Sequence, residues 1–219
     1  MPVLQLLTFH LPTPSAADTA SSTALSALKS AKAPQNLVLG ISIADKSTLQ
    51  LTSEWHDVAA AETTPETSHY RQTILQTLGT HKSTLHVSLH DKDESSAFSD
   101  RGPLASAVVE FVKIYFPAHK VDDDAAFRAQ IEADFEKFDA ICGRVVRGTG
   151  GVRYGWVVEE QEHAEVEGRK CRCFLVARGW EDMGFFEEVL GTNEYKEAVQ
   201  ILLAWAAPWE MWHVKRQSY

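Results

Sequence analysis

The pattern of apolar and polar positions predicts the same opening strand twice. Residues 3–12 read VLQLLTFHLP, and residues 108–117 read VVEFVKIYFP. Both segments are rich in apolar, β-branched and aromatic residues and end in a proline, which is typical of a β-strand. Aligned residue by residue, they place Gln5 opposite Glu110 in otherwise apolar rows. A strand that occurs twice suggests a repeated structural unit.

The elements predicted after each opening strand follow in the same order. For the first half the pattern predicts a helix within 12–33, strands at 36–44 and 48–55, a helical turn at 56–61, a helix at 68–78 and a strand at 83–90. For the second half it predicts a helix at 124–145, strands at 152–160 and 170–180, helices at 183–190 and 192–206, and a strand at 209–215. These orders support a duplication with two insertions.

Aligned single residues support the same interpretation. Gly40 aligns with Gly155, and the interval from Trp55 to Tyr70 equals the interval between their counterparts in the second half, Trp180 and Tyr195. The best-defined helix has apolar residues at spacings of four, four and three, which makes one apolar face: Phe127, Ile131, Phe135 and Phe138.

A polar, turn-rich stretch at 91–102, DKDESSAFSDRG, separates the two halves. We therefore divide the chain into a first unit at 1–92, a linker at 93–104 and a second unit at 105–219. Units of about 100 residues are long enough to bury a core. The chain is thus expected to fold as two similar units.

The segments at 54–74 and 179–199 resemble the helix region of dimeric α/β barrel proteins, which include antibiotic-biosynthesis monooxygenase-like and stress-responsive barrel families. The resemblance covers nearly the whole chain. It implies an α+β fold of two tandem ferredoxin-like units, each with a four-stranded antiparallel sheet, packed face to face as an intrachain barrel. Members of this group include oxygenases, polyketide cyclases and haem-degrading enzymes, so the fold does not decide the activity.

Charge and composition indicate which classes of partner and cofactor the protein is not expected to bind. The formal net charge is −9, which argues against nucleic acid. No apolar run approaches the roughly 20 residues of a membrane span, and no secretion signal is present, so we expect a cytoplasmic protein. We expect this protein to be a monomer or a homodimer. Three cysteines make no disulfide framework and no CxxC pair, so we expect reduced thiols and no metal site. Haem-degrading members use an asparagine that the first strand lacks, so we expect no cofactor.

Glu110 is the first candidate for chemistry. The resemblance implies that the row containing Glu110, Gln5 and Phe9 faces the barrel interior. Burial there would favour a protonated carboxyl and make Glu110 a candidate general acid or base. The alternative is that Glu110 lies near a strand end and reaches water or an arginine.

His69 is the second candidate. In SHYRQTI it resembles a helix position that carries a catalytic histidine at the cavity mouth of some barrel cyclases. A neutral imidazole can abstract a proton next to a carbonyl. The alternative is a solvated histidine near a helix N-terminus.

A further set of residues is expected to contact a ligand. Aromatic side chains stack on flat molecules and donate hydrogen bonds to them, although the same residues also serve as core. The set comprises Gln5, Phe9, Tyr154, Trp156, Trp180 and His213.

Two functions from different classes follow. The first is a barrel cavity that binds a small hydrophobic or aromatic molecule, as in a cofactor-independent cyclase, isomerase or monooxygenase of secondary metabolism. The alternative is a non-catalytic stress-responsive barrel that serves as a ligand-binding or protein-interaction module. A filled barrel interior would favour this second function.

Overall fold

The structure is a computed structural model of the chain, and it describes residues 2–11, 36–63, 72, 78–90 and 96–217. The first half contains β1 (Val3–His10), β2 (Leu37–Ser42), β3 (Thr48–Trp55), α2 (Val58–Glu62) and β4 (Thr80–Leu89). A 3-10 turn, η1 (Pro103–Ala105), precedes the second half. That half contains β5 (Val108–Pro117), α4 (Ala118–Asp123), α5 (Ala125–Cys142), β6 (Thr149–Val157), β7 (Gln161–Glu162), β8 (Lys170–Trp180), α6 (Met183–Gly191), α7 (Asn193–Leu203) and β9 (Trp209–Arg216).

Eight antiparallel strands close into a barrel in the order β5-β9-β2-β3-β1-β4-β6-β8, with β8 pairing back to β5 and the short β7 added to β8. The first four strands lie in the order β4-β1-β3-β2, and the four long strands of the second half lie in the order β9-β5-β8-β6. The two groups meet at two seams, β4–β6 and β2–β9. The predicted α+β barrel is therefore confirmed.

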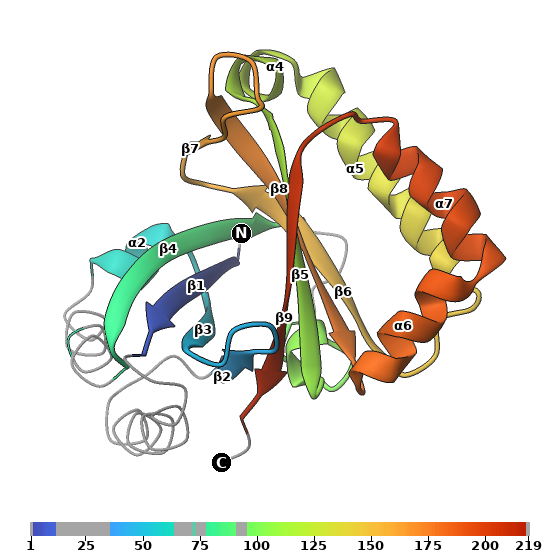
Figure 1. Cartoon of the computed structure of the whole chain (residues 1–219). Helices are drawn as coiled ribbons and strands as arrows, with labels where there is room; N and C mark the ends of the chain where they lie inside the picture. Colours follow the sequence, from blue (N-terminus) through green and yellow to red (C-terminus); the bar gives the residue numbers. More distant parts are fainter. Residues whose placement is uncertain (1, 12–35, 64–71, 73–77, 91–95, 218–219) are drawn as a thin grey trace.

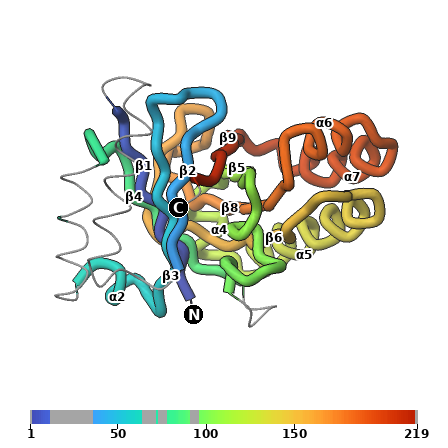
Figure 2. Tube along the Cα trace, turned by 90° about the horizontal axis from the view of Figure 1, so that it is seen from below, coloured from blue at the N-terminus to red at the C-terminus, as the bar shows by residue number. Residues whose placement is uncertain are grey.

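Three helices of the second half, α5, α6 and α7, lie outside the barrel on one side. Figure 1 shows α5, α6 and α7 beside the second-half strands, and Figure 2 shows the same three helices standing clear of the first half. Helix α5 begins where the carboxylate of Asp124 accepts hydrogen bonds from the backbone N–H groups of Ala126 and Phe127. Its residues Ile131 and Phe135 are buried against the sheet, so the apolar face predicted for this helix is confirmed.

A glycine lies at each seam between the halves. An alanine Cβ at Gly155 in β6 would lie 2.1 Å from the carbonyl oxygen of Ser88 in β4. A Cβ at Gly40 in β2 would lie 2.7 Å from the Cγ1 atom of Val214 in β9. Both seams therefore depend on a position without a side chain.

Apolar side chains from both halves fill the barrel interior. They form one cluster that includes Leu4, Leu6, Val87, Val109, Phe111, Leu175 and Val214. Among them the buried amide of Gln50 accepts a hydrogen bond from Trp212 Nε1 at 2.7 Å and donates one to Thr52. A cavity of about 10 Å³ in this region has room for no more than about one water molecule. The described side chains thus fill the space between the sheets where a ligand was expected.

The faces of β1 and β5 are the reverse of those expected. Leu4 and Leu6 belong to the interior cluster, whereas Gln5, Phe9 and Glu110 lie on the opposite, outer face. The prediction that the row of Glu110 faces the interior is therefore wrong. Both faces of these strands are buried and apolar, so the alternation reveals the two rows without showing which one is inside.

Candidate functional site

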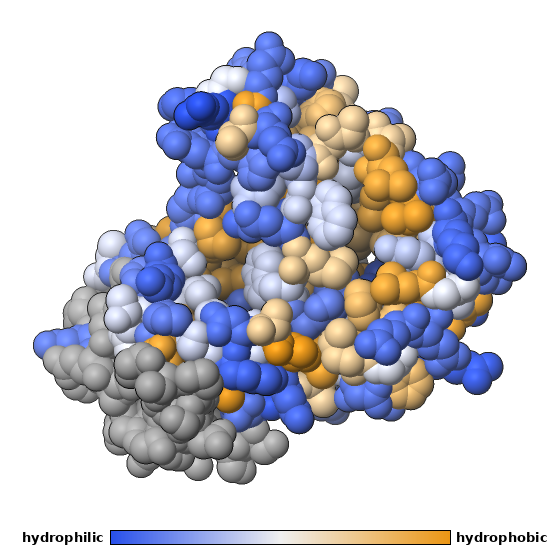
Figure 3. Space-filling view, viewed as in Figure 1, coloured by the Kyte–Doolittle hydropathy of each residue, from blue (hydrophilic) through white to orange (hydrophobic). Residues whose placement is uncertain are grey.

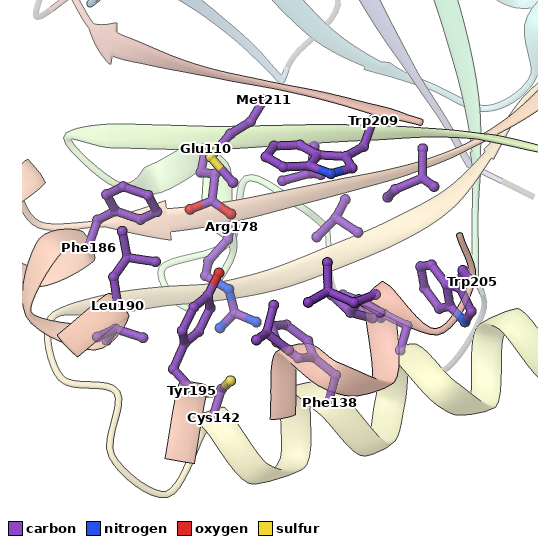
Figure 4. Close-up of a pocket in the computed structure, with 18 of the residues that line it drawn as sticks. Glu110, Phe138, Cys142, Arg178, Phe186, Leu190, Tyr195, Trp205, Trp209 and Met211 are labelled. Atoms are coloured by element: carbon purple, nitrogen blue, oxygen red, sulfur yellow. The ribbon is translucent and has the colours of Figure 1, made fainter. Parts of the chain in front are cut away.

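A cavity of about 240 Å³ lies between the outer face of the second-half sheet and helices α5, α6 and α7 (Figure 4). Strands β5, β8 and β9 form its floor, and the helices form its roof. The walls are predominantly apolar and include Val112, Ile114, Phe135, Phe138, Val176, Leu202 and Trp205. A concave, mostly apolar space with a few polar groups is the usual form of a small-molecule site.

Exposed apolar residues surround the cavity mouth. Trp209 and Met211 on β9 are 57% and 37% exposed, and Leu203 on α7 is 56% exposed. Figure 3 shows apolar surface on both sides of a hollow between β9 and the helices. Exposed apolar surface beside a cavity is one of the features of a ligand-binding groove.

Glu110 and Arg178 supply the charge in this cavity. They lie directly opposite each other on β5 and β8 and are 8% and 7% exposed. Trp180 Nε1 donates a hydrogen bond to Glu110 Oε2 at 3.0 Å. His213 lies opposite Glu110 on β9, with its Nε2 atom 3.7 Å from the same oxygen. The other carboxylate oxygen, Oε1, makes no hydrogen bond with the described residues, so it is available to a ligand.

Two helices present further polar groups to this end of the cavity. Arg178 forms an ion pair with Asp139 on α5, which ties β8 to that helix. Figure 4 shows the hydroxyl of Tyr195 on α7 pointing toward Glu110 and Arg178. Burial, and after it the charge of Glu110, raise the pKa of Tyr195. The Tyr195 hydroxyl therefore stays protonated and can donate a hydrogen bond.

No known family profile and no curated protein matches this sequence. Solved structures do match its fold. A protein of Lactobacillus acidophilus, provisionally described as a monooxygenase, superimposes with a TM-score of 0.59 at 10% identity over 99% of this chain and 94% of that one. An anthrone oxidase-like protein gives 0.59 at 12% identity over 99% and 92%. A mutant chlorite dismutase from Candidatus Nitrospira defluvii gives 0.54 at 8% identity over 99% and 91%. The chain has the dimeric α/β barrel fold.

Three residues predicted from the sequence meet at the cavity of this dimeric α/β barrel. Glu110 and Trp180 line it, and His213 lies beside them with its ring against Phe186. Their meeting follows from strand register, because all three lie on the outer face of adjacent strands.

The other predicted residues lie elsewhere. Tyr154 and Trp156 pack into the core beside the cavity, where they donate hydrogen bonds to Glu136 and Glu132 on α5 at 2.6 and 2.7 Å. Phe9 is fully buried among leucines of the first half, and Gln5 is fully buried against His86. His69 lies outside the described residues.

Sequence reasoning missed Arg178, Tyr195 and the exposed residues at the mouth. Arg178 had a signal, because it precedes Trp180 by two residues and therefore shares its face of the strand. Tyr195 was used to align the halves without being considered for the site. Trp209 and Met211 alternate on β9 in the same way.

In the part of the chain that the structure describes, no three His, Cys, Asp or Glu side chains lie together as a metal site would require. A haem does not fit the cavity lining either, since that lining contains no histidine and its one thiol, Cys142, is held protonated by burial. None of the described helices is long and apolar enough to cross a membrane.

Cys142 provides a test of how well the cavity excludes water. Burial raises the pKa of this thiol to about 11. Its thiolate fraction at pH 8 is therefore about 100-fold below that of an ordinary cysteine, and the thiolate is the form that reacts. We expect Cys142 to be alkylated by iodoacetamide about 100-fold more slowly than free cysteine, as measured by peptide mass spectrometry. Labelling of the folded protein at the free-cysteine rate would contradict a buried, apolar environment for this thiol.

Proposed function

We propose that this chain binds a small hydrophobic or aromatic molecule that carries a hydroxyl group, in the cavity between the second-half sheet and helices α5–α7. One observation carries the proposal: Glu110 stands in an apolar cavity with one oxygen hydrogen-bonded to Trp180 and the other free. A partly satisfied carboxylate at such a place accepts a proton or a hydrogen bond from a ligand.

The same geometry suits proton abstraction. Trp180 fixes the orientation of the Glu110 carboxylate, so its free oxygen can accept the proton of a phenol or of a carbon next to a carbonyl. The ligand becomes an anion, and Glu110 becomes neutral. The hydroxyl of Tyr195 and the guanidinium of Arg178 are placed to stabilise the new negative charge.

Removal of such a proton begins the cofactor-independent oxygenation, cyclisation and isomerisation of aromatic compounds. The names of two neighbours, a provisional monooxygenase and an anthrone oxidase-like protein, favour oxygenation.

We also propose that the chain is a tandem duplication of a ferredoxin-like unit. The shared strand order supports it, as do the helix caps. Asp57 and Asp182 each follow a tryptophan by two residues and cap the helix that comes after β3 or β8. Each unit covers the apolar inner face of the other, so the unfolding of one unit would expose that face of the other unit to water.

A second function is favoured by a different observation. The barrel interior is filled, as expected for a barrel that serves as a non-catalytic binding or interaction module. In that case the cavity would bind its ligand without turning it over. Glu110 distinguishes the two, since its carboxylate would contribute to ligand affinity in both and to turnover in the first alone.

Fluorescence titration with 1-naphthol tests the proposed site. Trp180, Trp205 and Trp209 line the cavity, so a bound ligand should quench their emission to saturation. Glu110→Gln should weaken binding about tenfold, because a hydrogen bond to a charged group is lost. Glu197→Gln, an exposed change on α7, is the matched control and should bind like the wild type. The proposal is wrong if the wild type shows no saturable quenching, or if both variants bind equally well.

A further inference from the structure

Each half of the barrel places a histidine opposite a side chain of glutamine or glutamate. Gln5 on β1 lies directly opposite His86 on β4, and Glu110 on β5 lies directly opposite His213 on β9. The two pairs occupy equivalent strands and point away from the barrel interior. The chain therefore contains the same arrangement with an amide in one half and a carboxylate in the other.

The pair in the first half is closed. Gln5 Nε2 lies 3.0 Å from His86 Nε2, so the amide N–H donates to that ring nitrogen. The other ring nitrogen, Nδ1, is hydrogen-bonded to the carboxylate of Glu159, which places the ring proton on Nδ1. Gln5 and His86 are both essentially inaccessible to solvent. With a donor at the position of Gln5, the ring nitrogen of His86 is satisfied, whereas the amide oxygen of Gln5, Oε1, is buried without a hydrogen-bond partner among the described residues.

The pair in the second half is open. Glu110 Oε2 and His213 Nε2 are 3.7 Å apart, which is beyond hydrogen-bond distance. His213 Nε2 is buried and has no hydrogen-bond partner among the described residues. A buried polar atom without a partner requires an explanation. Comparison with the first half supplies one, because a carboxylate lacks the donor that the amide of Gln5 provides, and one added proton would restore it.

We propose that Glu110 and His213 act as a pair that holds the one proton taken from the ligand. The inference rests on the proposed function. Glu110 is the group that contacts the ligand, and His213 is a positioning residue that acts through it. The proton leaves the ligand hydroxyl and binds the carboxylate, and the ligand remains as an anion. A half turn about the terminal torsion of Glu110, which has broad preferences, then presents the new O–H to His213 Nε2.

Among the described residues, the carboxylate that faces the His213 ring is that of Glu110. The ring of Phe186 on α6 packs edge-on against the imidazole at 4.5 Å. On the β2 side, the neighbour is the backbone N–H of Ile43, which donates to the carbonyl of His213. The other charged and titratable groups near this pair are Arg178 and Tyr195, which lie on the far side of Glu110 from His213, and Lys215. Lys215 is exposed and follows His213 by two residues on the same face of β9.

A chromogenic phenol tests the pair directly. 4-Nitrophenol absorbs in the visible only as its phenolate, and 4-nitroanisole is the matched ligand with no proton to lose. At about pH 6, where free nitrophenol is mainly protonated, wild-type protein should show the phenolate band on binding. His213→Gln keeps a side chain of similar length but cannot hold the proton, so it should lower the bound phenolate fraction at least tenfold. Its affinity for nitroanisole should remain within about twofold of the wild type.

The outcomes separate this inference from the proposed function. An equal phenolate fraction in wild type and His213→Gln would overturn the pair, and so would binding of nitrophenol by the wild type without a phenolate band. Both results would leave the binding site intact. A wild type that binds neither probe would overturn the proposed function and the pair together.

A crystal structure of Glu110→Gln gives a test that needs no ligand and no folded His213 variant. The new amide should close onto His213, with Nε2 to Nε2 about 3.0 Å apart as between Gln5 and His86. A separation that stays near 3.7 Å, or an imidazole that turns away, would contradict the inference.

Discussion

Phenylalanine in place of Val112 is expected to weaken binding of 1-naphthol at least 100-fold and to leave the free energy of unfolding nearly unchanged. Val112 lies on β5 between Glu110 and Ile114, and its side chain lines the cavity floor. The added ring would occupy space that the ligand needs. Because that space is empty in the protein, the ring displaces no packed side chain and the usual cost of overpacking does not arise.

The matched control for this prediction is Val158→Phe. Val158 is 42% exposed and does not line the cavity, so the same substitution there should alter neither binding nor stability. Calorimetric titration with 1-naphthol measures the affinity, and urea unfolding measures the stability. Unchanged affinity in Val112→Phe would show that the ligand binds elsewhere.

Alanine in place of Gly155 is expected to destabilise the barrel by about 3 kcal/mol, at the upper end of what overpacking costs. The new Cβ would lie 2.1 Å from the carbonyl oxygen of Ser88, a backbone atom that cannot rotate away. The β4–β6 seam contains three residue pairs, with Gly155 opposite Leu89, so a local shift affects much of it. Opening this seam exposes the apolar interior shared by both halves.

Gly191→Ala is the control for the seam variant. Gly191 ends α6, and nothing lies within 4 Å of a Cβ built there, so alanine should be neutral or slightly stabilising. Urea unfolding followed by tryptophan fluorescence compares the two proteins. Equal stability of Gly155→Ala and wild type would contradict the packing described at this seam.

Local pattern was enough to predict most of the described elements. The strands β3 and β8 were predicted with the bounds that they have, because each is a long run closed by a tryptophan and followed by a helix cap. Helix α5 was predicted from its four apolar residues, since a period near 3.6 is a local property of the chain. The predicted helices at 12–33 and 68–78 lie essentially outside the described residues.

The position of the site could not be predicted in the same way, because it depends on which face each row of side chains buries. Glu110 was correctly placed in an apolar row and wrongly placed inside the barrel. Tyr154 and Trp156 were predicted to contact a ligand. Their polar atoms instead donate hydrogen bonds to Glu136 and Glu132 on α5, a helix that lies about 20 residues earlier in the chain. Strand alternation cannot reveal a partner that a helix supplies only after folding.

The central claim is that a ligand binds between the second-half sheet and helices α5–α7, with its hydroxyl at Glu110. A crystal structure of the protein soaked with 1-naphthol tests this most directly. We predict density for the ligand above β5 and β8, with the hydroxyl oxygen within about 3 Å of Glu110 Oε1. Density inside the barrel, or an empty cavity at a saturating ligand concentration, would contradict the claim.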